Sequence, residues 1–178
     1  MNQKLKPLRQ LKLVGAALLV CSSASLFAAD APAEKAPAAA PAAAPAGPSP
    51  AKQAIAVRKA AFTLIANNFK PIGDVLQGKA EYDAAEIQKR ATRVAFLSEL
   101  LDGTFPEASN VGEPDTKAKA EIWTDRAEFD KKLKEFKEHA ATLAQVAAKE
   151  KTNSEAFKAA AGAVGQDCKG CHDKFKAK

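Results

Sequence analysis

The chain has 178 residues, 47% of them hydrophobic and 27% charged, with 27 lysines and arginines against 21 aspartates and glutamates. Four of the basic residues, and none of the acidic ones, lie within residues 1–28, so the rest of the chain carries 23 basic and 21 acidic side chains. This near balance excludes proteins that act through a strongly basic nucleic-acid-binding surface.

The first segment, residues 1–28, has the three parts of a secretory signal peptide. A basic start is followed by the apolar stretch 13–20 and by small residues from Ser22 to Ala29. Eight apolar residues are too few to span a bilayer, so we expect removal on export, a periplasmic protein and no transmembrane segment. Cys21 follows a sequence that loosely resembles a lipoprotein box, and lipidation there stays an alternative, although the bulky Val20 before it argues against processing.

The next segment, residues 29–51, is rich in alanine and proline. Six of the ten prolines of the chain lie in residues 31–51, and no apolar side chain larger than alanine recurs there. Such a composition cannot bury a core, so we expect a disordered linker of unassigned role. The folded domain is then expected from Lys52 to Lys178.

Four blocks with helical periodicity follow. The first runs from Lys52 to Phe69 and is expected to end before Pro71, and the second starts at a capping residue, Asp83, and ends by Gly103. The third starts near Asp125, and the fourth opens with a capping box over 152–155. Their sustained apolar spacing predicts an all-α fold, an antiparallel up-down four-helix bundle with a longer connection at 102–124.

The apolar positions predict which face of each later helix points inward. The second helix contributes Ile87, Ala91, Val94, Leu97 and Leu101. The third contributes Phe129, Leu133, Phe136, Ala140, Leu143 and Ala147, and the fourth contributes Phe157, Ala160, Val164, Cys168, Cys171 and Phe175.

The first helix has a charge within its apolar stripe. Arg58 falls within the stripe formed by Ile55, Phe62, Ile65 and Phe69. A buried cation needs a partner, unless the side chain extends along the helix to the bundle edge. A second stripe of Val57, Ala61 and Leu64 lies on another face, which indicates contact with another subunit or with a further helix of the same chain.

The most specific motif is Cys168-Lys169-Gly170-Cys171-His172, close to the C-terminus. The pattern C-x-x-C-H is typical of covalent haem c attachment, because the two thiols share a helix face and can form thioethers with the haem vinyl groups. His172 lies on that face and can ligate the iron. A disulfide between the two cysteines is the alternative, whereas a structural zinc site lacks further ligands. We expect one haem c per chain.

The composition restricts the second iron ligand. The only methionine is Met1, which lies in the signal peptide that we expect to be removed. The His/Met iron ligation of many electron carriers is therefore excluded. His139, the only other histidine, lies at the edge of the third helix's stripe, and a lysine would have to lose its proton to bind. We therefore expect five-coordinate iron held by His172, with apolar side chains across from it. A six-coordinate, low-spin electron-transfer cytochrome is the alternative.

The domain resembles cytochrome c-prime, the class II c-type cytochromes. The resemblance rests on the terminal CKGCHDKFK (168–176), together with VRKAAFTLIANNF (57–69), YDAAEI (82–87) and EIW (121–123), in the family's order. It implies a five-coordinate, high-spin haem that binds NO and often CO, and a homodimer packed through the first two helices.

The resemblance also implies roles for single residues. Cys168 and Cys171 match the thioether positions and His172 matches the proximal ligand. Lys176 matches a basic residue beside the imidazole, although a lysine is also common at a helix C-terminus. The remaining matches are Arg58 near the haem propionates, Phe62 over the open iron face and Trp123 near the haem edge. From the sequence alone, Phe62 is equally a core residue and Trp123 equally packs on the third helix.

The function expected from these features is a periplasmic haem protein that binds NO and CO and exchanges electrons with redox partner proteins. An enzyme such as a peroxidase needs an acid–base group near the iron. The inward stripe of the first helix offers Phe62 and Ile65 but no histidine, so we expect no catalytic residues and no enzyme.

Overall fold

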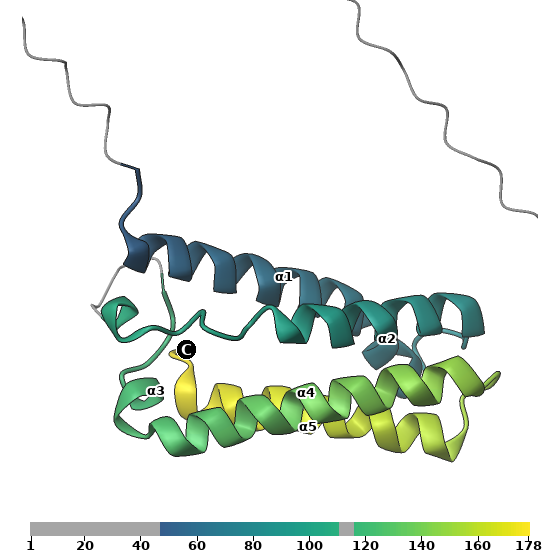
Figure 1. Ribbon diagram of the computed structural model, residues 1–178. Helices are drawn as coiled ribbons and strands as arrows, with labels where there is room; N and C mark the ends of the chain where they lie inside the picture. The colour runs from purple at the N-terminus through teal and green to yellow at the C-terminus, as the bar shows by residue number, and fades with distance from the viewer. Residues whose placement is uncertain (1–46, 111–115) are drawn as a thin grey trace, which may run out of the picture. The chain divides into compact units, whose positions relative to one another are not determined.

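The computed structural model describes residues 47–110 and 116–178, which hold a helical bundle (Figure 1). The signal peptide, Cys21 and most of the Ala/Pro segment lie outside the described residues. The long helices are α1 (Pro50–Leu76), α2 (Ala84–Glu99), α4 (Arg126–Lys149) and α5 (Glu155–Phe175). Two short helices, η1 (Glu107–Ser109) and α3 (Glu121–Thr124), lie in the connection between α2 and α4.

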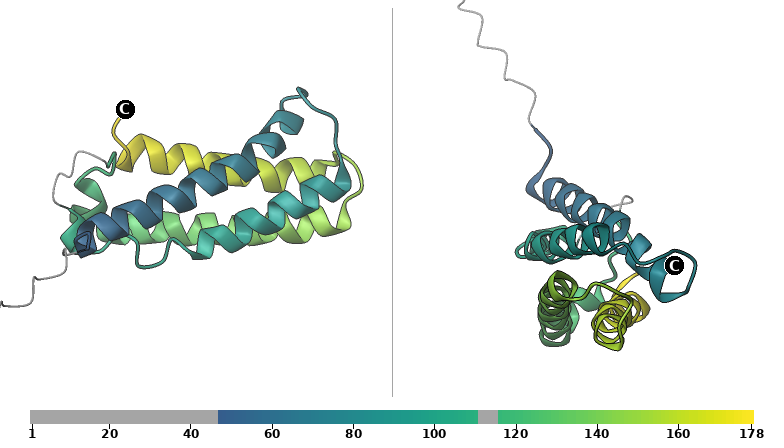
Figure 2. Two further views of the ribbon diagram at one scale, coloured as in Figure 1. Left: turned by 90° about the horizontal axis from the view of Figure 1, so that it is seen from above. Right: turned by 90° about the vertical axis from the view of Figure 1, so that its right-hand side faces the viewer.

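The four long helices form the up-down bundle that the periodicity predicts. Each runs opposite to the one before it, and α1 packs on α2, α2 on α4, α4 on α5, and α5 back on α1 (Figure 2). None of the helices in the described part of the chain is long and apolar enough to cross a membrane.

The expected end of α1 is wrong, because the helix continues through Pro71 to Leu76. A proline within a helix leaves the carbonyl four residues earlier without its usual N–H donor, here that of Asn67. Arg90 of α2 donates from Nη1 to this carbonyl oxygen at 3.3 Å. A side chain of the neighbouring helix thus replaces the missing backbone donor.

The helix starts follow from side-chain caps, with some differences from the predicted positions. The carboxylate of Asp83 accepts from the Glu86 N–H at 3.0 Å, as predicted. Helix α1 begins two residues before the expected boundary, since Ser49 caps it. Helix α5 is capped by Ser154, which accepts from Phe157 N–H at 3.2 Å, rather than by the first residue of the predicted box.

The core confirms the predicted inward faces of α2, α4 and α5. All the predicted positions of α2 are buried, and so are those of α4 apart from the partly buried Leu133. The stripe of α1 is rotated by one position, because Ala61 and Asn68 are buried where Phe62 and Phe69 were expected. Phe62 therefore lies at the flank of the core and is 37% exposed.

The chain end is tied to the α2–α4 connection. The Lys119 N–H donates to the Phe175 carbonyl at 3.0 Å, and the Ala177 N–H donates to the Lys117 carbonyl at 2.8 Å. Ala118 and Lys176 form an isolated antiparallel bridge between these two contacts. The residues that follow the haem motif are therefore held in place by residues 117–119.

Candidate haem site

Helix α5 presents the two cysteines of the motif to two parts of the core. Both side chains are partly buried, and both thiols are free. Cys168 packs against the main core cluster. Cys171 packs against a second, smaller cluster formed by Phe105, Ile122, Phe129 and Phe175. A group bonded to both sulfur atoms would thus lie along the border between the two clusters.

Burial and nearby charges favour the uncharged forms of both thiols and of the His172 imidazole. Burial raises the pKa of the Cys168 thiol to about 11, and the Asp167 carboxylate adds to this effect. Burial also raises the pKa of Cys171, against the opposing charge of Lys132. His172 is exposed at the helix surface, but partial loss of hydration and the Lys176 ammonium both lower its pKa. A neutral imidazole is the form that binds a metal ion.

Arg58 is buried and does not extend to the bundle edge. Only 3% of the residue is exposed. Its Nη1 donates to the Thr104 carbonyl oxygen at 3.2 Å and to Ser109 Oγ at 2.8 Å, and its Nη2 donates to Thr116 Oγ1 at 2.9 Å. Arg58 therefore fastens α1 to the connection between α2 and α4.

Aromatic rings continue from Phe62 into the second cluster. The ring of Phe62 meets Phe105 edge to face with centroids 6.4 Å apart. Phe105 meets Phe129 at 4.8 Å, and Phe129 meets Phe175 at 5.4 Å.

The predicted site residue Trp123 lies beside these aromatic rings and donates from Nε1 to the Pro106 carbonyl oxygen at 3.1 Å. The guanidinium of Arg58 lies 4.8 Å from the Phe105 ring centroid and 5.9 Å from that of Trp123.

The structure brings together a donor set suited to haem c. Two free thiols three residues apart and an imidazole whose pKa is lowered lie on the last turns of one helix, and Cys171 packs against an aromatic cluster. Besides burial, the charge of Lys176 acts on His172 by lowering the pKa of its imidazole. Arg58 and Trp123 lie together at the α2–α4 connection, and of the predicted site residues Trp123 and Cys171 pack against the second cluster, whereas Cys168 packs against the main one.

Sequence patterns did not identify Phe105 or Asp167 as parts of the site. They also did not predict the contact between the rings of Phe105 and Phe129. Phe105 lies in an irregular connection, where no periodicity marks a residue as buried. Asp167 Oδ2 lies 2.8 Å from Nδ1 of His139, and this pair joins α4 to α5 next to Cys168. The edge position expected for His139 is confirmed, since its side chain is 44% exposed.

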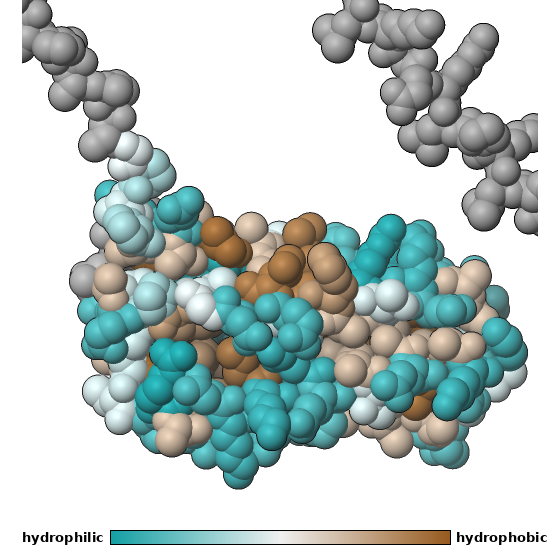
Figure 3. All heavy atoms as spheres, viewed as in Figure 1, coloured by the Kyte–Doolittle hydropathy of each residue, from teal (hydrophilic) through white to brown (hydrophobic). Residues whose placement is uncertain are grey.

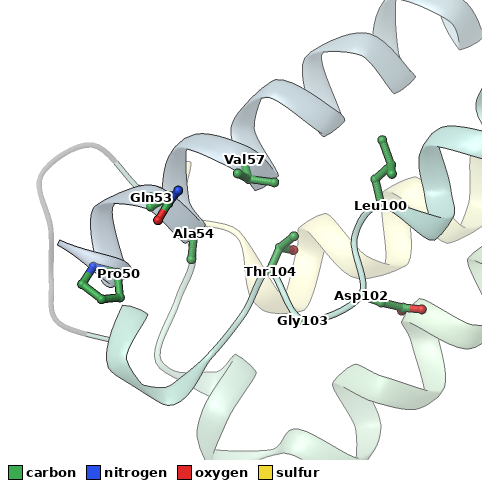
Figure 4. Close-up of a pocket in the computed structure, with 8 residues that line it drawn as sticks. All are labelled: Pro50, Gln53, Ala54, Val57, Leu100, Asp102, Gly103 and Thr104. Carbon is green, nitrogen blue, oxygen red and sulfur yellow. The ribbon is translucent and has the colours of Figure 1, made fainter. Parts of the chain in front are cut away.

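A surface depression of about 350 Å³ lies elsewhere on the molecule (Figure 4). Its lining comes from the first two turns of α1 and from the end of α2 and the residues after it: Pro50, Gln53, Ala54, Val57, Leu100, Asp102, Gly103 and Thr104. No residue of α5 lines it, so it is not the site of the C-x-x-C-H motif.

Comparison with known proteins agrees with the motif and the fold. A family model described as Cytochrome C' matches residues 53–176. The chain is 41% identical over 126 residues to a cytochrome c' from Rubrivivax gelatinosus, covering 70% of this chain and 95% of the relative. It is 37% identical over 129 residues to one from Halomonas halodenitrificans, covering 71% and 97%.

Solved structures give the same result. A cytochrome c prime from Shewanella frigidimarina superposes with a TM-score of 0.68 at 40% identity, covering 74% of this chain and 100% of that one. A nitric oxide complex of a cytochrome c prime variant from Alcaligenes xylosoxidans superposes with a TM-score of 0.64 at 32% identity, covering 74% and 99%.

Proposed function

This chain belongs to the cytochrome c′ family, whose members carry covalently bound haem c, and from that membership we propose that it is a periplasmic haem protein that binds NO and CO. We propose one haem per chain with a five-coordinate, high-spin iron that can also exchange electrons with redox partner proteins. Export rests on the signal peptide expected at residues 1–28.

The observation that carries this proposal is the donor set of α5. Cys168 and Cys171 would hold the haem, and His172 would bind its iron through a neutral imidazole. The Lys176 cation disfavours protonation of that imidazole and so keeps it ready to bind. When bound, the haem supplies a metal centre that takes diatomic ligands and changes its oxidation state by one electron.

Three side chains, those of His139, Phe62 and Phe105, support the proposal that one face of the iron has no protein ligand. His139, the one further histidine of the sequence, lies at the edge of the inward stripe of α4 with a side chain that is 44% exposed, which argues against its use as a second ligand. Phe62 and Phe105 would exclude water and protein donors from that face. Neither ring can give or take a proton, so this pair offers no general acid or base, and we propose no catalytic residues.

The gas ligands are proposed by similarity. The cytochrome c prime from Alcaligenes xylosoxidans named above is described as a nitric oxide complex, and it shares the fold at 32% identity. Electron transfer follows from the same cofactor, because an iron held in an apolar site can be oxidised and reduced without a change of protein ligand.

We also propose a homodimer formed through α1 and α2. Four large apolar residues on these helices are between 46% and 67% exposed: Val57, Leu64, Phe96 and Leu100. Figure 3 shows apolar side chains gathered along α1 on the face it displays. Exposed apolar side chains of this size are typical of a subunit interface, and Val57 and Leu100 both line the depression in Figure 4.

The experiment that tests this function uses the exported, matured protein. We expect haem staining that survives denaturation, and its loss in the Cys168→Ala/Cys171→Ala double variant. We expect a high-spin ferrous spectrum that changes on addition of CO or NO, and faster CO association in Phe62→Ala. A low-spin ferrous spectrum without added ligand would instead support the six-coordinate electron carrier and contradict our proposal.

A further inference from the structure

Phe105 is a buried ring of the second cluster that is held by contacts to both its backbone and its side chain. The carbonyl of Thr104 before it accepts from Arg58, and its own carbonyl oxygen accepts from Arg126 Nη1 at 3.0 Å. Its ring lies under the Arg58 guanidinium and against Phe129, and the residue is only 7% exposed. Backbone and side chain are therefore both fixed, although no helix contains the residue.

Phe62 is the opposite case, since it lies at the flank of α1 and is 37% exposed. A side chain with this much exposure has rotamers open to it that a core residue does not have. The aromatic contact that the structure gives it is the one with Phe105, at 6.4 Å. Arg58 lies one turn before Phe62 on the same helix and contacts the Phe105 ring, so it joins the helix that carries Phe62 to the segment that carries Phe105.

We propose that Phe105 is the positioning residue for Phe62: the fixed ring restricts the mobile one to the orientation that narrows access to the iron. This inference rests on the proposed function, because it assigns Phe62 to the open iron face. The alternative is that Phe105 only fills the core. The two roles predict different effects on ligand binding. A residue that positions Phe62 affects the rate of ligand binding only while Phe62 is present.

The test is a double-mutant cycle on CO association in the haem-loaded protein. We expect Phe105→Leu to speed CO association about three- to tenfold, the factor that one edge-to-face contact represents. In a Phe62→Ala background the same substitution should change the rate less than about twofold, because the restricted ring is gone. Phe105→Met serves as a second variant if the leucine variant folds poorly.

Phe157 provides a matched control. It is fully buried and meets Tyr82 edge to face at 4.9 Å, but it lies on the first turn of α5, far along the helix from the motif. Phe157→Leu makes the same change of size and removes the same kind of contact. We expect it to lower stability and to leave the CO association rate unchanged.

A second readout does not depend on gas binding. With a fluorine-labelled phenylalanine at position 62, the 19F resonance should shift and sharpen in Phe105→Leu and stay unchanged in Phe157→Leu. An unchanged resonance, or equal rate changes with and without Phe62, would overturn the positioning role. A wild-type protein that takes up no CO or NO would contradict the proposed function, and the 19F comparison would then decide the inference by itself.

Discussion

Replacing Arg58 by methionine tests whether one buried cation holds α1 to the α2–α4 connection. The substitution keeps most of the aliphatic side chain but leaves the Thr104 carbonyl and Ser109 Oγ without the donor that Arg58 supplies, whereas Thr116 Oγ1 still accepts from the Ala118 N–H at 3.1 Å. Thr104 and Ser109 are buried, so water cannot replace the guanidinium without local opening. Each buried acceptor left unpaired costs about 1–3 kcal/mol, and relief from burying the charge offsets part of that sum.

We therefore expect Arg58→Met to lower the free energy of unfolding by about 3 kcal/mol. For a domain of this size the loss corresponds to a decrease in Tm of roughly 10 °C. Urea unfolding followed by circular dichroism at 222 nm measures it directly. A covalently attached haem stays on the folded and the unfolded chain alike, so it does not add a concentration dependence to the comparison.

Arg93 offers a matched control, because it is an exposed arginine on α2. Arg93→Met makes the same chemical change at the surface and should alter the free energy of unfolding by less than about 0.5 kcal/mol. If Arg58→Met destabilises the protein by no more than about 1 kcal/mol beyond this control, the hydrogen bonds of Arg58 do not hold the connection as we argue.

Three further predictions concern the core, the acid range and the proposed dimer. Leu143→Ala, at a fully buried position of α4, should lower the free energy of unfolding by about 3 kcal/mol in thermal or urea unfolding, and a near-neutral effect would contradict the packing described. The hydrogen bond and ion pair with Lys174 lower the pKa of Asp125 from its ordinary 3.8, so the pair stabilises the fold above that value and this contribution is lost as the pH falls. A Tm difference between wild type and Asp125→Asn should therefore be present at neutral pH and vanish in strong acid; a difference that persists there would have another origin. Phe96→Ser should shift sedimentation velocity profiles from dimer toward monomer, and unchanged profiles would place the interface elsewhere.

Much of the bundle could be predicted because periodicity is a local signal. The apolar positions of α2, α4 and α5 recur at three and four residues, and the same positions are buried in the structure, apart from the partly buried Leu133, Cys168 and Cys171. The C-x-x-C-H motif likewise depends only on spacing along one helix. The path of α1 through Pro71 could not be predicted, since the donor that compensates for it comes from Arg90 on another helix.

The surroundings of the site were harder to predict for the same physical reason. Arg58 was recognised as a charge in an apolar stripe, but its hydrogen-bond partners lie between 46 and 58 residues further along the chain. Phe105 lies in an irregular segment, where burial depends on tertiary contacts alone. The rotation of α1 that exposes Phe62 and buries Asn68 likewise depends on how the neighbouring helices pack.

The pairing of residues 117–119 with the end of α5 has a practical consequence for work with this protein. An affinity tag fused after Lys178 would begin two residues beyond Ala177, whose N–H donates to the Lys117 carbonyl. Residues added there would follow directly on the pairing that holds the last turn of the helix that carries His172. A purification handle is better inserted upstream of Ser49, before the residue that caps α1.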